Sequence, residues 1–65
     1  MITKIDILPY IGENVVDALP RIEEQYSNFD VQIVPYGMMI TLEYDVNRVN
    51  VWVDVNNKIS DITQG

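Results

Sequence analysis

The chain has 65 residues, of which 48% are hydrophobic, and its ten acidic and four basic side chains give a net charge of −6. This charge argues against nucleic acid and anionic membranes as partners, because both bind clusters of Lys and Arg. Cysteine and histidine are absent, which excludes disulfides, a Ser-His or Cys-His nucleophile pair and a typical zinc site. We therefore expect a protein that is not an enzyme and binds no cofactor or metal. The short length predicts one small domain, residues 1–65.

The N-terminal segment, residues 1–10, is rich in aliphatic side chains and is closed by Pro9. We predict an extended arm or a short edge strand that fills the core. The segment lacks the pattern of a signal peptide, and no stretch of the chain approaches the roughly 20 apolar residues of a membrane span. We expect a cytoplasmic protein, or a secreted one if a signal has been removed and Met1 is an added start. The aliphatic residues are Ile2, Ile5, Ile7 and Leu8.

One amphipathic helix is predicted over residues 14–27. Its apolar side chains recur at spacings of 4, 3 and 4, which places them on one helical face. Asn14 is the expected N-cap, and Asp17 lies in the first turn, where a carboxylate meets the positive end of the helix dipole. Glu23 and Glu24 fit a solvated face better than the alternative of a calcium site. The apolar residues are Val15, Leu19, Ile22 and Tyr26.

Pro20 conflicts with this helix. Inside a helix proline removes one backbone hydrogen bond and clashes with the preceding turn, at a cost of about 3 kcal/mol. We therefore expect either a kink at Pro20 or a shorter helix in which Pro20 is the first residue.

The second half of the chain contains three predicted strands. Residues 30–34 form a β-branched run, and residues 49–55 alternate valine with Asn50, Trp52 and Asp54, as in a strand with one buried face. Asn56-Asn57 predicts a two-residue turn into a last short strand at Ile59–Ile62, which completes a hairpin.

Residues 35–47, between the first two strands, show no helical period and contain several large apolar side chains. A loop of this length in a small domain is usually functional, and exposed apolar side chains commonly mark a binding surface. Two adjacent methionines cannot both point inward on an extended segment, so we expect at least one of Met38 and Met39 to contact a partner.

The segment Thr41-Leu42-Glu43, followed by Asn47-Arg48-Val49, resembles the reactive-site region of the potato type I family of serine protease inhibitors (chymotrypsin-inhibitor and eglin-like). The resemblance extends over about residues 8–65. Residues 25–31 are similar to the family's helix end and first strand, residues 34–37 to its loop entry, and Leu8-Pro9 to its N-terminal motif. Residues 48–51 and the ending Gln64-Gly65 also resemble a related bacterial and fungal elastase-inhibitor family, with Gln64 in place of a cysteine.

The resemblance implies an α+β fold, with a single helix packed on a small mixed sheet and a long exposed reactive-site loop between two parallel strands. It implies a serine protease inhibitor that binds as a substrate would, with the scissile bond at Leu42-Glu43. The uncharged Leu42 suits chymotrypsin-, subtilisin- or elastase-like pockets. The reactive-site loop would comprise Gly37, Met38, Met39, Ile40, Thr41, Leu42, Glu43, Tyr44 and Asp45.

Three residues of the following strand are expected to support the loop. Arg48 would donate hydrogen bonds to Thr41 and Glu43, although a lone surface arginine is by default only solvated. Trp52 is expected to pack against the underside of the loop. Asn50 stands at the position where the resemblance to plant and leech members of the family implies a second supporting arginine. Because Asn is shorter, we expect fewer hydrogen bonds to hold the loop in this chain.

We expect a monomer whose partner is a serine protease. Asn50 and the missing cysteine motivate an alternative, in which the chain is a non-inhibitory interaction module or scaffold on the same fold.

Overall fold

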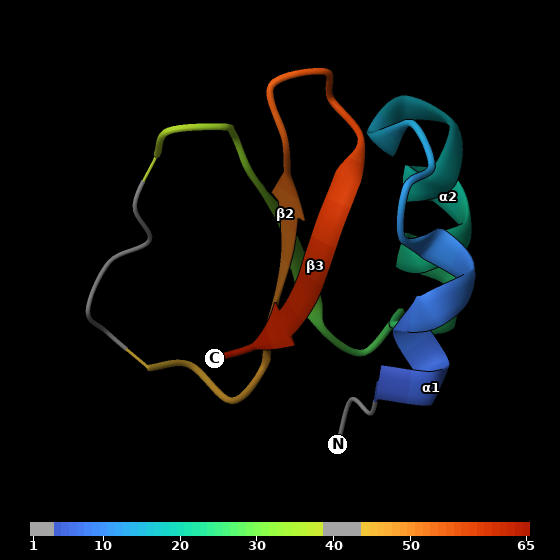
Figure 1. The fold of residues 1–65 in the computed structure, drawn as a ribbon. Coiled ribbons are helices and arrows are strands. Elements are labelled where there is room, and N and C mark those ends of the chain that lie inside the picture. The colour runs from blue at the N-terminus through green and yellow to red at the C-terminus, as the bar shows by residue number, and fades with distance from the viewer. Residues whose placement is uncertain (1–3, 39–43) are drawn as a thin grey trace.

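The computed structural model describes residues 4–38 and 44–65. The described chain begins with α1 (Lys4–Ile7), a 3-10 turn η1 (Leu8–Tyr10) and α2 (Val15–Gln25), and continues with β1 (Asp30–Val34), β2 (Arg48–Val53) and β3 (Ile59–Gln64). The strands lie in the order β1-β2-β3, with β1 parallel and β3 antiparallel to β2. The predicted α+β class and the mixed sheet are confirmed. Figure 1 shows α2 on one side of the sheet and the described ends of the β1–β2 connection on the other.

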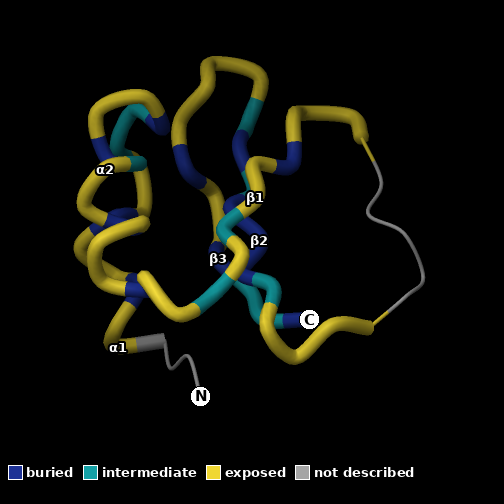
Figure 2. The backbone as a smooth tube through the Cα atoms, turned by 180° about the vertical axis from the view of Figure 1, so that it is seen from behind, coloured by how far each residue is buried: buried dark blue, intermediate teal, exposed yellow. Residues whose placement is uncertain are grey.

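The core lies between α2 and the face of the sheet that β2 covers with valines. Val49 and Val51 are fully buried, as is Ile22 of α2, so the predicted inward row of valines is confirmed. The prediction of a single buried face is wrong at Asn50, which is buried on the opposite face. Val55 does not continue this buried row, because the strand ends at Val53 and the Val55 side chain is 70% exposed. Figure 2 shows the buried positions gathered where α2 and the strands face each other.

The predicted helix is present but shorter than residues 14–27. Asn14 caps it, since its side-chain oxygen Oδ1 accepts a hydrogen bond from the Val16 N–H at 2.9 Å. Pro20 lies inside the helix, so the alternative in which Pro20 begins it is wrong. The cap explains this outcome, because Asn14 fixes the first turn one residue before Val15 and well ahead of the proline.

Replacing Pro20 with alanine is expected to raise the free energy of unfolding by about 1–2 kcal/mol. The substitution restores a helical N–H, and this gain exceeds the smaller benefit that proline brings by restricting the unfolded chain. Pro20 is exposed, so no packing is lost. Urea titration measures the change, with the exposed Glu23→Ala on the same helix as the control. An unchanged or lower stability of Pro20→Ala would contradict this expectation.

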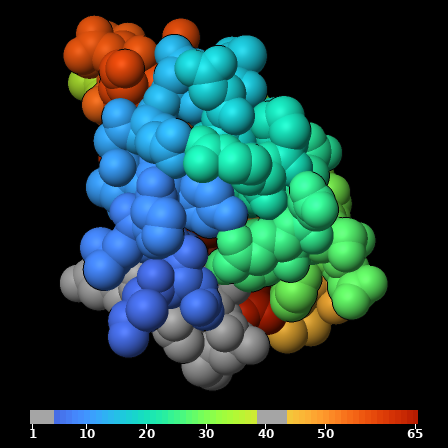
Figure 3. All heavy atoms as spheres, turned by 90° about the vertical axis from the view of Figure 1, so that its right-hand side faces the viewer, coloured from blue at the N-terminus to red at the C-terminus, as the bar shows by residue number. Residues whose placement is uncertain are grey.

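The prediction of an extended arm at the N-terminus is wrong, because residues 4–10 form α1 and η1. Ile7 and Tyr10 are buried three residues apart, a helical spacing, whereas Ile5 and Leu8 are exposed. Pro9 fits this helical segment because it lies at the start of η1, where its missing N–H breaks no bond. Figure 3 shows this segment packed against one side of α2.

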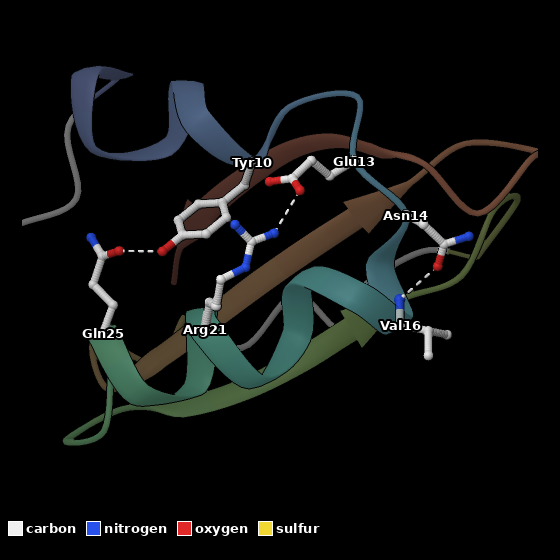
Figure 4. A network of polar contacts seen from close by, with 6 residues as sticks. All are labelled: Tyr10, Glu13, Asn14, Val16, Arg21 and Gln25. Carbon is white, nitrogen blue, oxygen red and sulfur yellow. Dashed lines mark hydrogen bonds and ion pairs between the residues drawn. The ribbon is translucent and has the colours of Figure 1, made fainter.

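Polar contacts join the N-terminal segment to α2 (Figure 4). The Tyr10 hydroxyl donates a hydrogen bond to Oε1 of Gln25, and the Arg21 guanidinium lies 5.7 Å from the centre of the Tyr10 ring. Arg21 also forms an ion pair with Glu13. The segment is thus held on the helix by an aromatic side chain that is apolar on its body and hydrogen-bonded at its tip.

The β2–β3 hairpin is confirmed, but its turn is longer than the predicted two residues. Residues 55–57 form the loop, because Asp54 N–H donates to Lys58 O at 2.8 Å and Asn57 N–H donates to Asp54 O at 3.0 Å. Asn57 has a φ of 60°, the left-handed residue that ends a three-residue hairpin loop. Asn57 therefore has the predicted tolerance of positive φ, in a different turn.

Candidate functional site

The connection between β1 and β2, residues 35–47, is a loop that crosses the sheet. Parallel strands require the chain to return to the opposite end of the sheet, and a helix usually makes that crossing. Here α2 precedes both strands, and the described stems of the loop, residues 35–38 and 44–47, lie on the other side of the sheet (Figure 1). The sheet face opposite α2 therefore looks toward this loop.

Both ends of the loop are held in hydrogen-bonded turns. At the entry, Met38 N–H donates to Pro35 O at 3.0 Å, and Gly37 has a φ of 82°, the value for the third residue of a type II turn. At the exit, Arg48 N–H donates to Asp45 O at 3.0 Å, and Asn47 N–H donates to the Asp45 side chain at 2.9 Å. The two stems have defined directions before any partner binds.

The predicted loop residues fall into two groups. Gly37, Met38, Tyr44 and Asp45 lie in the described stems and are exposed. Met38 is 60% exposed, and contact of Met38 or Met39 with a partner stays a prediction. The remaining five, Met39, Ile40, Thr41, Leu42 and Glu43, lie outside the described residues.

The three predicted support residues, Arg48, Asn50 and Trp52, alternate with the buried valines along β2. Arg48 Nε donates to the main-chain oxygen of Gly65 at 2.9 Å, and Asn50 Nδ2 donates to the same oxygen at 2.7 Å. Gly65 N–H in turn donates to Arg48 O at 2.9 Å. The structure therefore brings Arg48 and Asn50 together on one acceptor at the end of β3.

Trp52 is half-buried, and its indole Nε1 donates to Thr63 Oγ1 at 2.8 Å. The same hydroxyl lies 3.4 Å from Asn50 Nδ2. This hydrogen bond fixes the plane of the indole ring on the face that looks toward the loop. Packing of Trp52 against the underside of the loop stays a prediction.

Asn50 is 2% exposed, which is unusual for a polar residue, and its amide nitrogen is well satisfied. Its Oδ1 is buried and accepts no hydrogen bond from the described part of the chain. A buried acceptor without a donor costs free energy, so the contacts of the amide nitrogen have to outweigh that cost. Asn50 thus takes part in the hydrogen bonding at Gly65, and its role in supporting the loop stays a prediction.

Replacing Asn50 with alanine is expected to lower the free energy of unfolding by about 1–2 kcal/mol, since the Gly65 oxygen loses one of its two donors and a small cavity opens. Chemical denaturation of the variant beside Asn28→Ala, which removes an exposed asparagine, gives the comparison. Equal stability of the two variants would show that Asn50 contributes nothing net.

Tyr44 lies against Gly65. A Cβ built on Gly65 would lie 2.6 Å from Cε2 of the Tyr44 ring, so only glycine permits this approach. Tyr44 is nevertheless 75% exposed. The C-terminal residues thus contact the loop exit through a ring as well as through hydrogen bonds.

Sequence reasoning missed Thr63 as a member of the site and treated Gln64-Gly65 only as part of a resemblance. The signal that could have found them is the antiparallel register, which pairs Asn50 with Thr63 and Val49 with Gln64. The two-residue turn predicted at Asn56-Asn57 implies this same pairing, because the longer observed loop and the register shift between Trp52 and Val53 offset each other.

Within residues 4–38 and 44–65, no three His, Cys, Asp or Glu side chains gather where they could hold a metal ion, so Glu23 and Glu24 belong to no such group. The helices in these two ranges are also too short or too polar to cross a membrane. The described chemistry of the site is hydrogen bonding and apolar contact.

A model of the Potato inhibitor I family matches residues 10–62. The chain belongs to the Potato inhibitor I family. It is 38% identical over 40 residues to subtilisin inhibitor CLSI-I of Canavalia lineata, and the aligned region covers 62% of this chain and 62% of that protein. It is 28% identical over 58 residues to subtilisin inhibitor 1 of Phaseolus angularis, covering 89% of this chain and 63% of that protein. The chain thus spans a little under two thirds of the length of these two family members.

Solved structures confirm the family fold. The elastase inhibitor AFUEI superimposes with a TM-score of 0.71 at 28% identity, over 89% of this chain and 81% of that one. The bitter gourd trypsin inhibitor gives a TM-score of 0.74 at 24% identity, over 88% and 85% of the two chains, and shows the fold alone. The sequence resemblance to the potato type I family is confirmed.

Proposed function

We propose that this member of the Potato inhibitor I family inhibits a serine protease by presenting residues 37–45 to the active site as a substrate would, with the scissile bond between Leu42 and Glu43. The observation that carries the proposal is the crossing loop, whose two stems are fixed by turns and whose exit is anchored to β3. The names of its relatives, which are inhibitors of subtilisin and elastase, support the same activity.

The physical basis of tight binding is preorganisation. A loop already held in its bound shape loses little conformational entropy on association, so a small contact surface suffices for high affinity. Arg48 is well placed to contribute, because Gly65 orients its Nε and a guanidinium carries five donors in a rigid fork. In the proposed arrangement, its other donors bind Thr41 and Glu43, and charge-assisted bonds of this kind are about twice as strong as neutral ones.

Leu42 is the proposed specificity residue. Its uncharged branched side chain suits the apolar pocket of chymotrypsin-, subtilisin- or elastase-like enzymes and offers nothing to the buried carboxylate of a trypsin-like pocket. The chain itself is proposed to be a monomeric single domain, residues 1–65, with no catalytic role.

A titration against a panel of proteases tests the proposal. Subtilisin, chymotrypsin and elastase of known active-site concentration are each mixed with increasing amounts of the chain, and trypsin serves as the discriminating control. We expect stoichiometric one-to-one inhibition of at least one of the first three and markedly weaker inhibition of trypsin. Micromolar or weaker inhibition of the whole panel would contradict the proposal and favour the non-inhibitory interaction module.

A further inference from the structure

We propose that Gln64 is a positioning residue for the reactive-site loop, holding the loop exit so that the bound loop is hydrolysed slowly, an inference that rests on the proposed function. Gln64 is the last residue of β3 and lies opposite Val49 of β2. Its side-chain Nε2 donates to the main-chain oxygen of Val46 at 2.7 Å. Val46 precedes β2 by two residues and lies inside the turn at the loop exit.

The exit turn is held by both strands that flank β2 in the sheet. From the β1 side, Asp30 N–H donates to the oxygen of Asn47 at 2.7 Å. From the β3 side, Gln64 binds the oxygen of Val46, the preceding residue. Two successive carbonyls are thus bound by two different strands, which fixes the direction in which the turn leaves the sheet.

Among the hydrogen bonds that join the described exit stem to a neighbouring strand, the bond to Val46 lies nearest in sequence to the proposed scissile bond, and it would add a main-chain anchor to the side-chain bond proposed from Arg48 to Glu43. Without it, the first residue of the described exit stem whose main chain is hydrogen-bonded to a neighbouring strand is Asn47, four residues beyond Glu43. With it, the tied chain begins one residue earlier, and each free residue adds up to about 3.5 Å of reach to a cut end. A shorter free segment keeps the amine released at Glu43 closer to its former partner carbonyl, which favours re-formation of the bond over release.

The side chain of Gln64 is suited to this task because a carboxamide nitrogen is a neutral donor on a flexible stem of sufficient length. One such hydrogen bond in a solvent-accessible position contributes modestly. We therefore expect an effect on hydrolysis of about threefold to tenfold, and no loss of the fold.

The test compares three substitutions at this position in the full chain. Gln64→Leu keeps the approximate size and removes the donor, Gln64→Glu keeps the shape and removes the donor, and Gln64→Lys supplies a donor on a long stem. The rate at which an inhibited protease cleaves each variant is measured, together with its melting temperature. We expect the Leu and Glu variants to be cleaved about threefold to tenfold faster and the Lys variant to recover toward wild type, with little change in melting temperature.

Gln32→Leu is the matched control. Gln32 also has an exposed side-chain amide that donates a hydrogen bond, at 2.9 Å, but its acceptor is Asp30 and not the loop. This variant should be cleaved at the wild-type rate. Equal cleavage rates for wild type and Gln64→Leu, in a chain that does inhibit, would overturn the inference, as would a failure of Gln64→Lys to recover.

Amide hydrogen exchange separates this inference from the proposed function, because it requires no protease. Gln64→Leu should speed the exchange of the Asn47 and Arg48 amides, whose bonds to Asp45 define the exit turn. If the wild-type chain inhibits nothing, the proposed function fails, and faster exchange in this variant still supports the tether. Unchanged exchange would overturn the tether in either case.

Discussion

Leu42→Asp is expected to weaken inhibition of subtilisin or chymotrypsin by about a thousandfold or more. The substitution would place a carboxylate without a partner in an apolar specificity pocket of the protease. A thousandfold loss of affinity corresponds to about 4 kcal/mol, and burying an unpaired charge can cost more than that. Inhibition constants from progress curves measure the change. The fold should be unaffected, because the core of this chain lies on the other side of the sheet, between α2 and the valines of β2.

Leu42→Phe is the control for this substitution, because it keeps an apolar side chain at the same position. It should retain inhibition of chymotrypsin, whose pocket accepts large apolar groups. If Leu42→Asp inhibits within about tenfold of the wild-type chain, then Leu42 does not occupy the specificity pocket and the proposed register is wrong.

Ile22→Ala should lower the free energy of unfolding by about 3 kcal/mol. Ile22 is fully buried in α2 against the sheet, so truncation removes buried apolar surface and leaves a cavity. Denaturation in urea measures the loss, provided that the dependence of the unfolding free energy on urea concentration is the same for both proteins. A chain of this size has a total stability of only about 3–10 kcal/mol, so the variant should be partly unfolded on warming.

Val16→Ala on the same helix is the matched control, because Val16 is 74% exposed and its loss should change stability by less than about 0.5 kcal/mol. Similar effects at Val16 and Ile22 would contradict the assignment of the buried helix face. The two large effects also have different signatures. Ile22→Ala reduces inhibition only as far as it unfolds the chain, whereas Leu42→Asp acts on a folded chain.

Periodicity explains why α2 and β2 could be predicted from the sequence. Val15 and Ile22 recur on one helical face, and Val49, Val51 and Val53 alternate along a strand, so each pattern has one simple solution. Residues 4–10 offered no such pattern. Their β-branched side chains and Pro9 favoured an extended arm, whereas contacts of Ile7 and Tyr10 within the core stabilise a helical segment. Tertiary packing outweighed local propensity there.

For the site, the sequence predicted the strand face of the β2 residues but not their hydrogen bonds to β3. Arg48, Asn50 and Trp52 could be assigned to the face opposite the valines, because alternation in a strand fixes the face of every residue. Their hydrogen-bond partners were not predicted. The two-residue turn expected at Asn56-Asn57 already pairs Asn50 with Thr63, as observed, but the register of two strands does not show which side chains bond each other. The real loop has three residues, and the pairing shifts by one residue between Trp52 and Val53, where Ser60 has no partner in the register, so the two differences cancel at Asn50. Neither feature has a clear signal in the sequence.

The cleaved bond tests the central claim most directly. The chain is incubated with a catalytic amount of a protease that it inhibits, and the products are located by mass spectrometry. We predict slow cleavage at one position, between Leu42 and Glu43, with the two fragments remaining associated. A first cut at any other bond, or rapid general degradation, would contradict the proposal that residues 37–45 occupy the active site as a substrate does.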